Sequence, residues 1–206
     1  MTDKLTLDLV RRITALERRL DDLVRPEVPE AIGEWKFIAE TVLSATASSV
    51  TLSSIPGTYR MLVLLMQSRT DYGAEFDFVG GRFNGDSGNN YDRFMKQRDG
   101  AGNATYVVAR ATSSMHVAHC EGANSRASVF TVSTTYILGY ALTDREKWLF
   151  TVGSGRWGNR SADSDLYLTE LKSSWRSTAA VTSITLFPRY GSNLVSGCRF
   201  ALYGVL

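Results

Sequence analysis

The first 25 residues carry apolar side chains at a spacing that alternates between four and three residues. These apolar positions are Leu9, Ile13, Leu16, Leu20 and Leu23. On an α-helix they form one seam, with Ile13 and Leu20 at heptad position a and the other three at d. Charged residues crowd the flanking positions, so the apolar stripe is narrower than the face that a helix buries in a globular core. The pattern predicts a coiled coil, and the alternative is an amphipathic helix that packs onto its own domain.

The same heptad frame places two charged residues where neighbouring helices pair across the seam. Arg12 falls at position g and Glu17 at position e of the following heptad. The sequence from Arg12 to Glu17 resembles the trimerisation motif of short parallel three-stranded coiled coils, which implies that the arginine reaches the glutamate of the next chain. Ile at a with Leu at d favours two strands, so the expected trimer depends on this motif and on Leu20. Because three heptads are marginal in isolation, the rest of each chain must help to hold the trimer.

After a coiled coil over residues 1–25, residues 26–34 are expected to form a stiff linker, because Pro26 and Pro29 oppose helical geometry. From Trp35 onward the apolar residues follow a period of two, as in Val50 and Leu52. About ten such segments, separated by turns rich in glycine, asparagine and aspartate, predict an antiparallel β-sandwich or barrel over residues 35–206. The chain is therefore expected to be mainly β.

Two segments of this region carry more specific signals. The run from Met61 to Met66 is apolar without alternation, which predicts a central strand covered on both faces. A neighbouring subunit and a long loop are both possible covers for its outer face. Phe83-Asn84-Gly85 predicts a β-hairpin, with an exposed tip formed by the polar residues that follow.

Composition and charge exclude some classes of function but do not identify one. The 206 residues are 44% hydrophobic and 21% charged, as in an ordinary soluble domain, and the net charge of +2 is too small to indicate nucleic acid or an anionic membrane as partner. The longest apolar run is far too short to span a membrane, and charges occupy the N-terminus where a cleaved signal peptide would be apolar. Cys120 and Cys198 are expected to be buried as small apolar groups.

Two groups of residues invite a metal-binding interpretation. The first contains His116, His119, Cys120 and Glu121, and the second contains Asp86, Asn89, Asn90 and Asp92. Residues three apart face opposite sides of an extended strand, so the two histidines cannot share an ion unless the chain bends there. The second group lacks the spacing of the helix-loop-helix calcium site, and turns rich in aspartate and asparagine are common without metal. We therefore predict no metal and no cofactor.

Catalytic and sugar-binding residues are also weakly indicated. Ser154 lies in Gly-Ser-Gly, which lacks the spacing of a nucleophile elbow, and Asp163, Asp165 and Glu170 form no specific pair for glycoside hydrolysis. We predict that the protein is not an enzyme. Three tryptophans, Trp148, Trp157 and Trp175, could stack on sugar rings, and Trp157 is expected to be the most exposed because glycines surround it. The alternative is that these tryptophans fold over the edge of the sandwich.

Four separated motifs occur in an order that resembles a family of small phage structural proteins, namely tail or virion appendage proteins. The motifs lie at Ser49–Arg60, Arg82–Tyr91, Trp175–Ile184 and Leu202–Leu206. The resemblance covers about residues 35–206. It implies a jelly-roll-like sandwich on a multimeric appendage of the virion, and it implies no catalytic residue.

Together these observations predict a homotrimeric component of a tail fibre, head fibre or capsid decoration. It would be assembled in the bacterial cytoplasm and attached to other virion proteins by its N-terminal end, with no nucleic acid bound and no membrane insertion. The alternative function is a head that binds a host receptor or glycan through loop residues, for which the candidates are Asp86, Asn89, Asn90 and Trp157. A polysaccharide hydrolase on the same scaffold is a third possibility.

Overall fold

The computed structural model describes residues 12–15, 33–156 and 166–206. The chain divides into two compact units, Met1–Glu34 and Trp35–Leu206. In the first unit residues 12–15 are helical, and this segment contains Arg12 and Ile13 of the predicted seam. The other predicted interface residues, Leu9, Leu16, Glu17, Leu20 and Leu23, lie outside the described residues. The coiled coil and its trimeric state therefore stay predictions.

Twelve strands lie in the described part of the second unit. They are β1 (Trp35–Val42), β2 (Val50–Leu52), β3 (Met61–Ser68), β4 (Phe76–Phe83), β5 (Tyr91–Asp99), β6 (Ala104–Thr112), β7 (Met115–Glu121), β8 (Thr131–Leu138), β9 (Lys147–Arg156), β10 (Leu166–Trp175), β11 (Ile184–Pro188) and β12 (Arg199–Val205).

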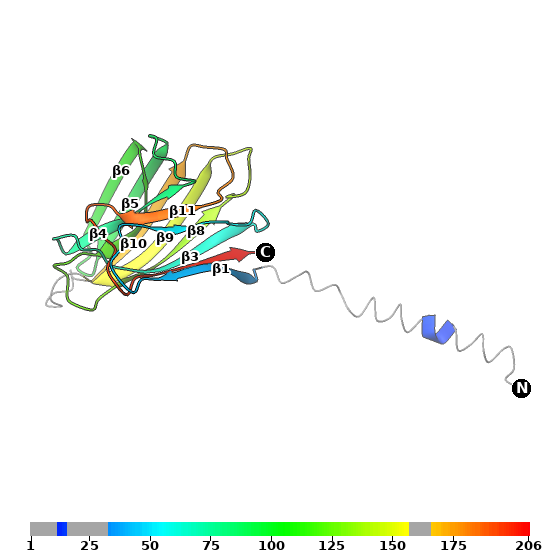
Figure 1. Cartoon of the computed structure of the whole chain (residues 1–206), viewed down its shortest axis with the longest axis horizontal. Coiled ribbons are helices and arrows are strands. Elements are labelled where there is room, and N and C mark those ends of the chain that lie inside the picture. Colours follow the sequence, from blue (N-terminus) through cyan, green and yellow to red (C-terminus); the bar gives the residue numbers. More distant parts are fainter. Residues whose placement is uncertain (1–11, 16–32, 157–165) are drawn as a thin grey trace, which may run out of the picture. The chain divides into compact units, whose positions relative to one another are not determined.

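These strands form two sheets. The larger sheet has eight strands in the order β1-β12-β3-β8-β9-β10-β5-β6, and the smaller has four in the order β2-β11-β4-β7 (Figure 1). Every pairing between these strands is antiparallel. Strand β7 of the smaller sheet contacts β8, β9 and β10 of the larger sheet, so the two sheets pack as a sandwich. The prediction of a mainly β, antiparallel sandwich is confirmed.

The main core lies between the two sheets and follows from the alternation in the sequence. In β8 the residues Thr131, Ser133, Thr135 and Ile137 are buried, while the residues between them are exposed or half-buried. The larger sheet contributes Leu62, Leu64, Phe200 and Leu202 to the core, and the smaller sheet contributes Val79, Phe83, Ile184 and Leu186. A second cluster, which contains Phe78, Met95 and Leu171, is separate from the main core.

Strand β3 is central, as its continuous apolar sequence predicts. It lies between β12 and β8, and Leu62, Leu64 and Met66 point into the main core. On the opposite face Val63 is completely buried, because it lies in register between Tyr203 and Tyr136, whereas Leu65 is only half-buried. The outer face of this strand is thus only partly covered within the chain.

Strand β7 is the edge strand of the smaller sheet, yet each of its residues is buried. Its free carbonyl groups accept hydrogen bonds from side chains of the larger sheet. Thr151 donates to the Val117 carbonyl at 2.7 Å, and Ser173 donates to the His116 carbonyl at 3.0 Å. Thr135 lies 3.2 Å from the same Val117 oxygen and 2.7 Å from the Thr151 hydroxyl. Buried carbonyl groups require such partners, so these hydroxyls allow an unpaired strand edge to lie inside the sandwich.

The predicted hairpin after Phe83 is wrong. Strand β4 belongs to the smaller sheet and β5 to the larger, so residues 84–90 cross between the sheets. Asn84 and Gly85 do adopt positive φ angles of 51° and 70°, as the turn signal implies. The Asn84 side chain then holds a distant segment: it donates to the Ala180 carbonyl at 2.7 Å and accepts from the Thr182 amide at 2.8 Å.

Removal of the hydroxyls that hold β7 is expected to destabilise the protein. Thr151→Val preserves the shape of the side chain but removes the donor to Val117, and Thr135→Val in addition leaves that carbonyl without a side-chain donor. We expect the double variant to lose about 1–3 kcal/mol of unfolding free energy, measured by urea denaturation. Thr134→Val, on the outer face of β8, serves as the control. If all three variants unfold at the same urea concentration, the hydroxyl contacts do not stabilise β7.

Candidate interaction surface

The outer face of the larger sheet carries an apolar row that crosses all eight strands. The strand registers align Phe37, Tyr203, Val63, Tyr136, Phe150, Lys172, Phe94 and Val108 in this order from β1 to β6. We call these eight residues the cross-strand row. Lys172 is its one charged member, and its Nζ atom lies 6.0 Å from the centre of the Phe150 ring. The face of an aromatic ring attracts a cation, so the Lys172 side chain can lie among the apolar residues of the row.

Much of the cross-strand row is open to solvent at its two ends. Phe37 is 61% exposed at the β1 edge and Val108 is 62% exposed at the β6 edge. Further exposed apolar side chains lie on the same face, including Trp35, Val132, Leu138, Trp148 and Leu168. Exposed apolar side chains that gather on one face of a protein often mark an interaction site. The face is therefore a candidate for contact with another protein.

The area of this face suits a stable interface. Eight strands about 4.8 Å apart and four rows of residues about 7 Å apart give about 700 Å², close to the roughly 800 Å² per partner in a standard interface. Two pairs of opposite charges on the face lie within the chain. Lys96 lies 3.6 Å from Glu170, and Arg199 lies 2.5 Å from Glu40. Paired charges at the rim of an apolar surface are typical of protein interfaces.

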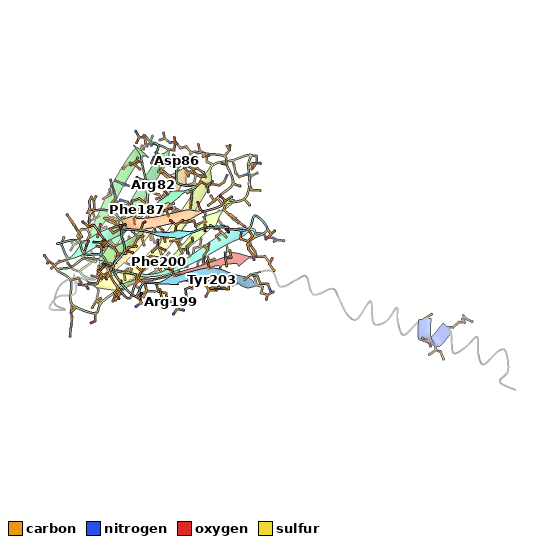
Figure 2. All side chains as sticks on the ribbon, viewed as in Figure 1. Arg82, Asp86, Phe187, Arg199, Phe200 and Tyr203 are labelled. Atoms are coloured by element: carbon orange, nitrogen blue, oxygen red, sulfur yellow. The ribbon has the colours of Figure 1, made fainter. Side chains whose placement is uncertain are left out.

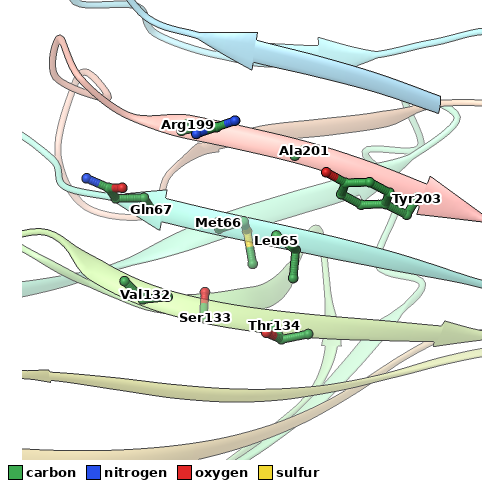
Figure 3. A pocket seen from close by; sticks show the side chains of 9 residues that line it. All are labelled: Leu65, Met66, Gln67, Val132, Ser133, Thr134, Arg199, Ala201 and Tyr203. Carbon is green, nitrogen blue, oxygen red and sulfur yellow. The ribbon is translucent and has the colours of Figure 1, made fainter. Parts of the chain in front are cut away.

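The same face contains two shallow hollows. One, of about 320 Å³, lies between β12, β3 and β8, where Leu65, Val132, Thr134, Ala201 and Tyr203 line it (Figure 3). The other, of about 430 Å³, lies toward β5 and β6 and is lined by Phe94, Val108, Trp148 and Lys172 among others. Hollows of this kind can accept protruding side chains of a partner.

The loop residues predicted as ligand-binding candidates have structural partners. The Asp86 carboxylate accepts hydrogen bonds from the Trp175 indole at 2.6 Å, the Gly88 amide at 2.8 Å and the Asn90 side chain at 3.0 Å. Burial opposes ionisation of Asp86, but these hydrogen bonds outweigh it and lower the pKa of its carboxyl group. Asn89 is exposed in the same loop, and Trp157 lies outside the described residues.

The second carboxylate of this region is engaged elsewhere. The Asp92 side chain accepts hydrogen bonds from Arg176 at 2.6 and 3.0 Å and from the Ala111 amide at 2.9 Å. The Asp86 and Asp92 side chains therefore bind to different parts of the chain. Within the described ranges, no three His, Cys, Asp or Glu side chains come together in a way that could hold a metal ion.

His116 and His119 do not point to opposite sides, as they would in a regular extended strand, because β7 departs from that geometry between them. The register between β4 and β7 shifts after Val79, so Val117 is an extra residue and forms a β-bulge. As a result both imidazoles contact the same ring, with centroid distances of 4.4 Å and 5.1 Å to Phe78. Both histidines are buried, and burial is the main cause that lowers the pKa of each to about 3. They are therefore neutral at physiological pH.

The remaining candidates are scattered. Cys120 and Cys198 are buried free thiols, as expected from the sequence, and burial raises the pKa of both. Ser154 and Glu170 lie on the outer face of the larger sheet, while Asp163 and Asp165 fall outside the described residues. Trp175 is buried against Asp86, whereas Trp148 is 55% exposed on the outer face. The structure brings no nucleophile and base together among the candidates that it describes.

The main surface feature was missed from the sequence. Its signal is present in β8, where the outward-facing alternate positions include Val132, Tyr136 and Leu138 instead of polar residues only. Comparison with protein-family models gives no match, and comparison with curated proteins gives none either. Within the described part of the chain, no helix is long and apolar enough to cross a membrane.

The role of Asp86 can be tested through pH. The lowered pKa means that the ionised carboxylate stabilises the fold above the unfolded pKa of about 4, and that this contribution is lost as the pH falls through the folded value. We expect Asp86→Asn to reduce the unfolding free energy by about 1–2 kcal/mol at neutral pH and by much less near about pH 3. Glu75→Gln is the control, because the Glu75 side chain is exposed and forms no hydrogen bond or ion pair within the described residues. A difference that does not change with pH would contradict this role.

Proposed function

We propose that this chain is a structural component of a bacteriophage particle, a homotrimer in which a coiled coil over residues 1–25 precedes a jelly-roll-like sandwich over residues 35–206. The observation that carries the proposal is the outer face of the larger sheet, where the cross-strand row is exposed at its two ends and further apolar side chains are exposed beside it. A three-heptad coiled coil needs a second source of association energy, and an apolar sheet face of interface size supplies it. The phage assignment is supported by the resemblance of the four sequence motifs.

The proposed assembly gives each part of the chain a task. The N-terminal end attaches to another virion protein, the coiled coil sets the number of chains, and the sheet faces add contacts between the sandwiches. A structural protein of this kind needs no catalytic group, which is compatible with the paired and dispersed carboxylates of the described residues.

One observation favours a second function, the recognition of a host glycan. Trp148 is exposed beside the hollow of about 430 Å³ that Phe94 and Lys172 also line. Exposed aromatic rings next to polar groups can stack on sugars. Binding of a glycan in this hollow requires that the end of the face toward β5 and β6 is left uncovered in the trimer.

The proposed trimer predicts a mass of three times 22.8 kDa for the full chain in light scattering. Leu138→Glu places a charge on the outer face, where Leu138 is 52% exposed, and is expected to weaken the association. Leu142→Glu is a matched control, since Leu142 is 44% exposed but lies in the loop after β8. A wild-type monomer, or equal effects of both substitutions, would exclude the sheet face as the interface.

The predicted pairing of Arg12 with Glu17 leads to a separate test. Arg12→Ala or Glu17→Ala should lower the melting temperature of the trimer or allow other oligomers, because each removes one partner of the interchain pair. Arg11→Ala and Arg18→Ala, on the predicted outer face of the helix, are the controls. Analytical ultracentrifugation of the four variants distinguishes them, and equal behaviour of all four would contradict the trimerisation motif.

Attachment to the particle can be tested with a truncation. Deletion of residues 1–7 is expected to leave a folded trimer that is no longer incorporated into virions, as measured by immunoblotting of purified particles. Normal incorporation of this variant would mean that another part of the chain attaches it.

A further inference from the structure

A group of nitrogen donors lies beside the second cluster of buried residues, away from the cross-strand row. Arg93 is on β5, two residues before Met95, so both side chains lie on the face of that strand that is directed toward Phe78. His116 stacks on the Phe78 ring at 4.4 Å, and the Arg189 amide donates to the Phe78 carbonyl at 2.8 Å. Three segments distant in sequence thus bring Arg93, His116 and Arg189 together around one phenylalanine.

These donors have no acceptor within the described residues. The Nε and Nη1 atoms of Arg93, Nε of Arg189 and Nε2 of His116 are all buried, and none of these four atoms has a hydrogen-bond partner there. His116 is 3% exposed, while the two arginines are half-buried and so remain partly accessible from solvent. A buried polar group without a hydrogen-bond partner lowers the stability of the fold. Several such groups in one place indicate that a ligand accepts their hydrogen bonds.

No carboxylate of the described residues compensates the charges of the group, although the Arg189 guanidinium lies 5.5 Å from the centre of the Tyr190 ring. Burial and then the neighbouring charge of Arg189 lower the pKa of Arg93, and burial followed by the charges of Arg93 and Arg189 lowers the pKa of His116 to about 3. Within the described chain neither arginine forms an ion pair. Two neighbouring guanidinium groups without a carboxylate repel each other, and an anion between them would reverse the sign of the interaction.

The buried carboxylate of Asp77, the residue before Phe78, cannot serve as the missing acceptor. Asp77 accepts hydrogen bonds from the Thr70 hydroxyl at 3.0 Å and from the Tyr190 and Gly191 amides at 3.1 and 3.0 Å. Its oxygens are therefore occupied, and these bonds fix the chain directly after Arg189. Arg82, on the same strand as Phe78, is also engaged, because it lies over the Phe187 ring at 5.0 Å and donates to the Ser113 carbonyl at 3.0 Å (Figure 2).

We propose that Arg93, Arg189 and His116 form a binding site for a small oxyanion, such as a phosphate or sulfate group or the carboxylate of an acidic sugar. Guanidinium groups bind such anions through paired N–H donors, and a neutral imidazole adds one further donor. The site goes beyond the proposed structural role and does not depend on it, because it lies within one chain.

Melting temperatures test the site directly. Sodium phosphate and sodium sulfate, each compared with sodium chloride at equal ionic strength, are expected to raise the melting temperature by about 3–6 °C once the anion exceeds its dissociation constant tenfold. Sodium glucuronate tests the acidic-sugar source in the same way. The double variant Arg93→Gln/Arg189→Gln should lose this response yet be no less stable in chloride, since it removes the repulsion. Arg98→Gln, exposed on the opposite face of β5, should keep the response.

A second readout remains informative if the double variant does not fold. The chain has two histidines, so its imidazole NMR signals are simple to follow. Titration of the wild-type protein with each anion should shift the His116 signal strongly and the His119 signal little, with the two assigned through His116→Gln. Absence of any anion-specific stabilisation, equal stabilisation of the double variant, or equal shifts of both histidines would overturn the proposal.

Discussion

The fold depends on how the free edge of β7 is buried. An edge strand normally needs a strand partner or water, and β7 has instead the hydroxyls of Thr135, Thr151 and Ser173 from three neighbouring strands of the larger sheet. This allows the larger sheet to continue past the smaller one toward β5 and β6. The second cluster lies where Phe78 of the smaller sheet meets Met95 of β5 and Leu171 of β10, and His116 stacks on the same Phe78 ring.

Features that depend on adjacent residues could be predicted from the sequence, whereas features that depend on long-range contacts could not. Period-two alternation was sufficient to predict an antiparallel β-sandwich and a central strand at Met61–Met66. The positive φ angles of Asn84 and Gly85 were also predictable, since a turn signal concerns only adjacent residues. The hairpin was wrong because the sheet in which β5 pairs is decided by packing elsewhere in the chain.

The features of the candidate sites were less accessible from the sequence. The bulge at Val117 accompanies a close approach of β4 and β7, in which a Cβ atom at Gly81 would collide with the Val117 side chain. The partner of Asp86 is Trp175, which lies 89 residues away. The cross-strand row likewise requires the order of all eight strands, because its members come from eight separate segments. Contacts of this range leave no local pattern.

The strict alternation of β8 has a consequence for how this protein can change. Its inward residues Ser133, Thr135 and Ile137 serve the interior, and the intervening Thr134, Tyr136 and Leu138 face outward. Adjacent residues of β8 therefore contact different surroundings. A substitution at an outward position leaves the packing of the adjacent inward side chain unchanged. During evolution, the outward residues of β8 could be substituted one at a time, which would change the partner that the outer face binds while the core stays the same.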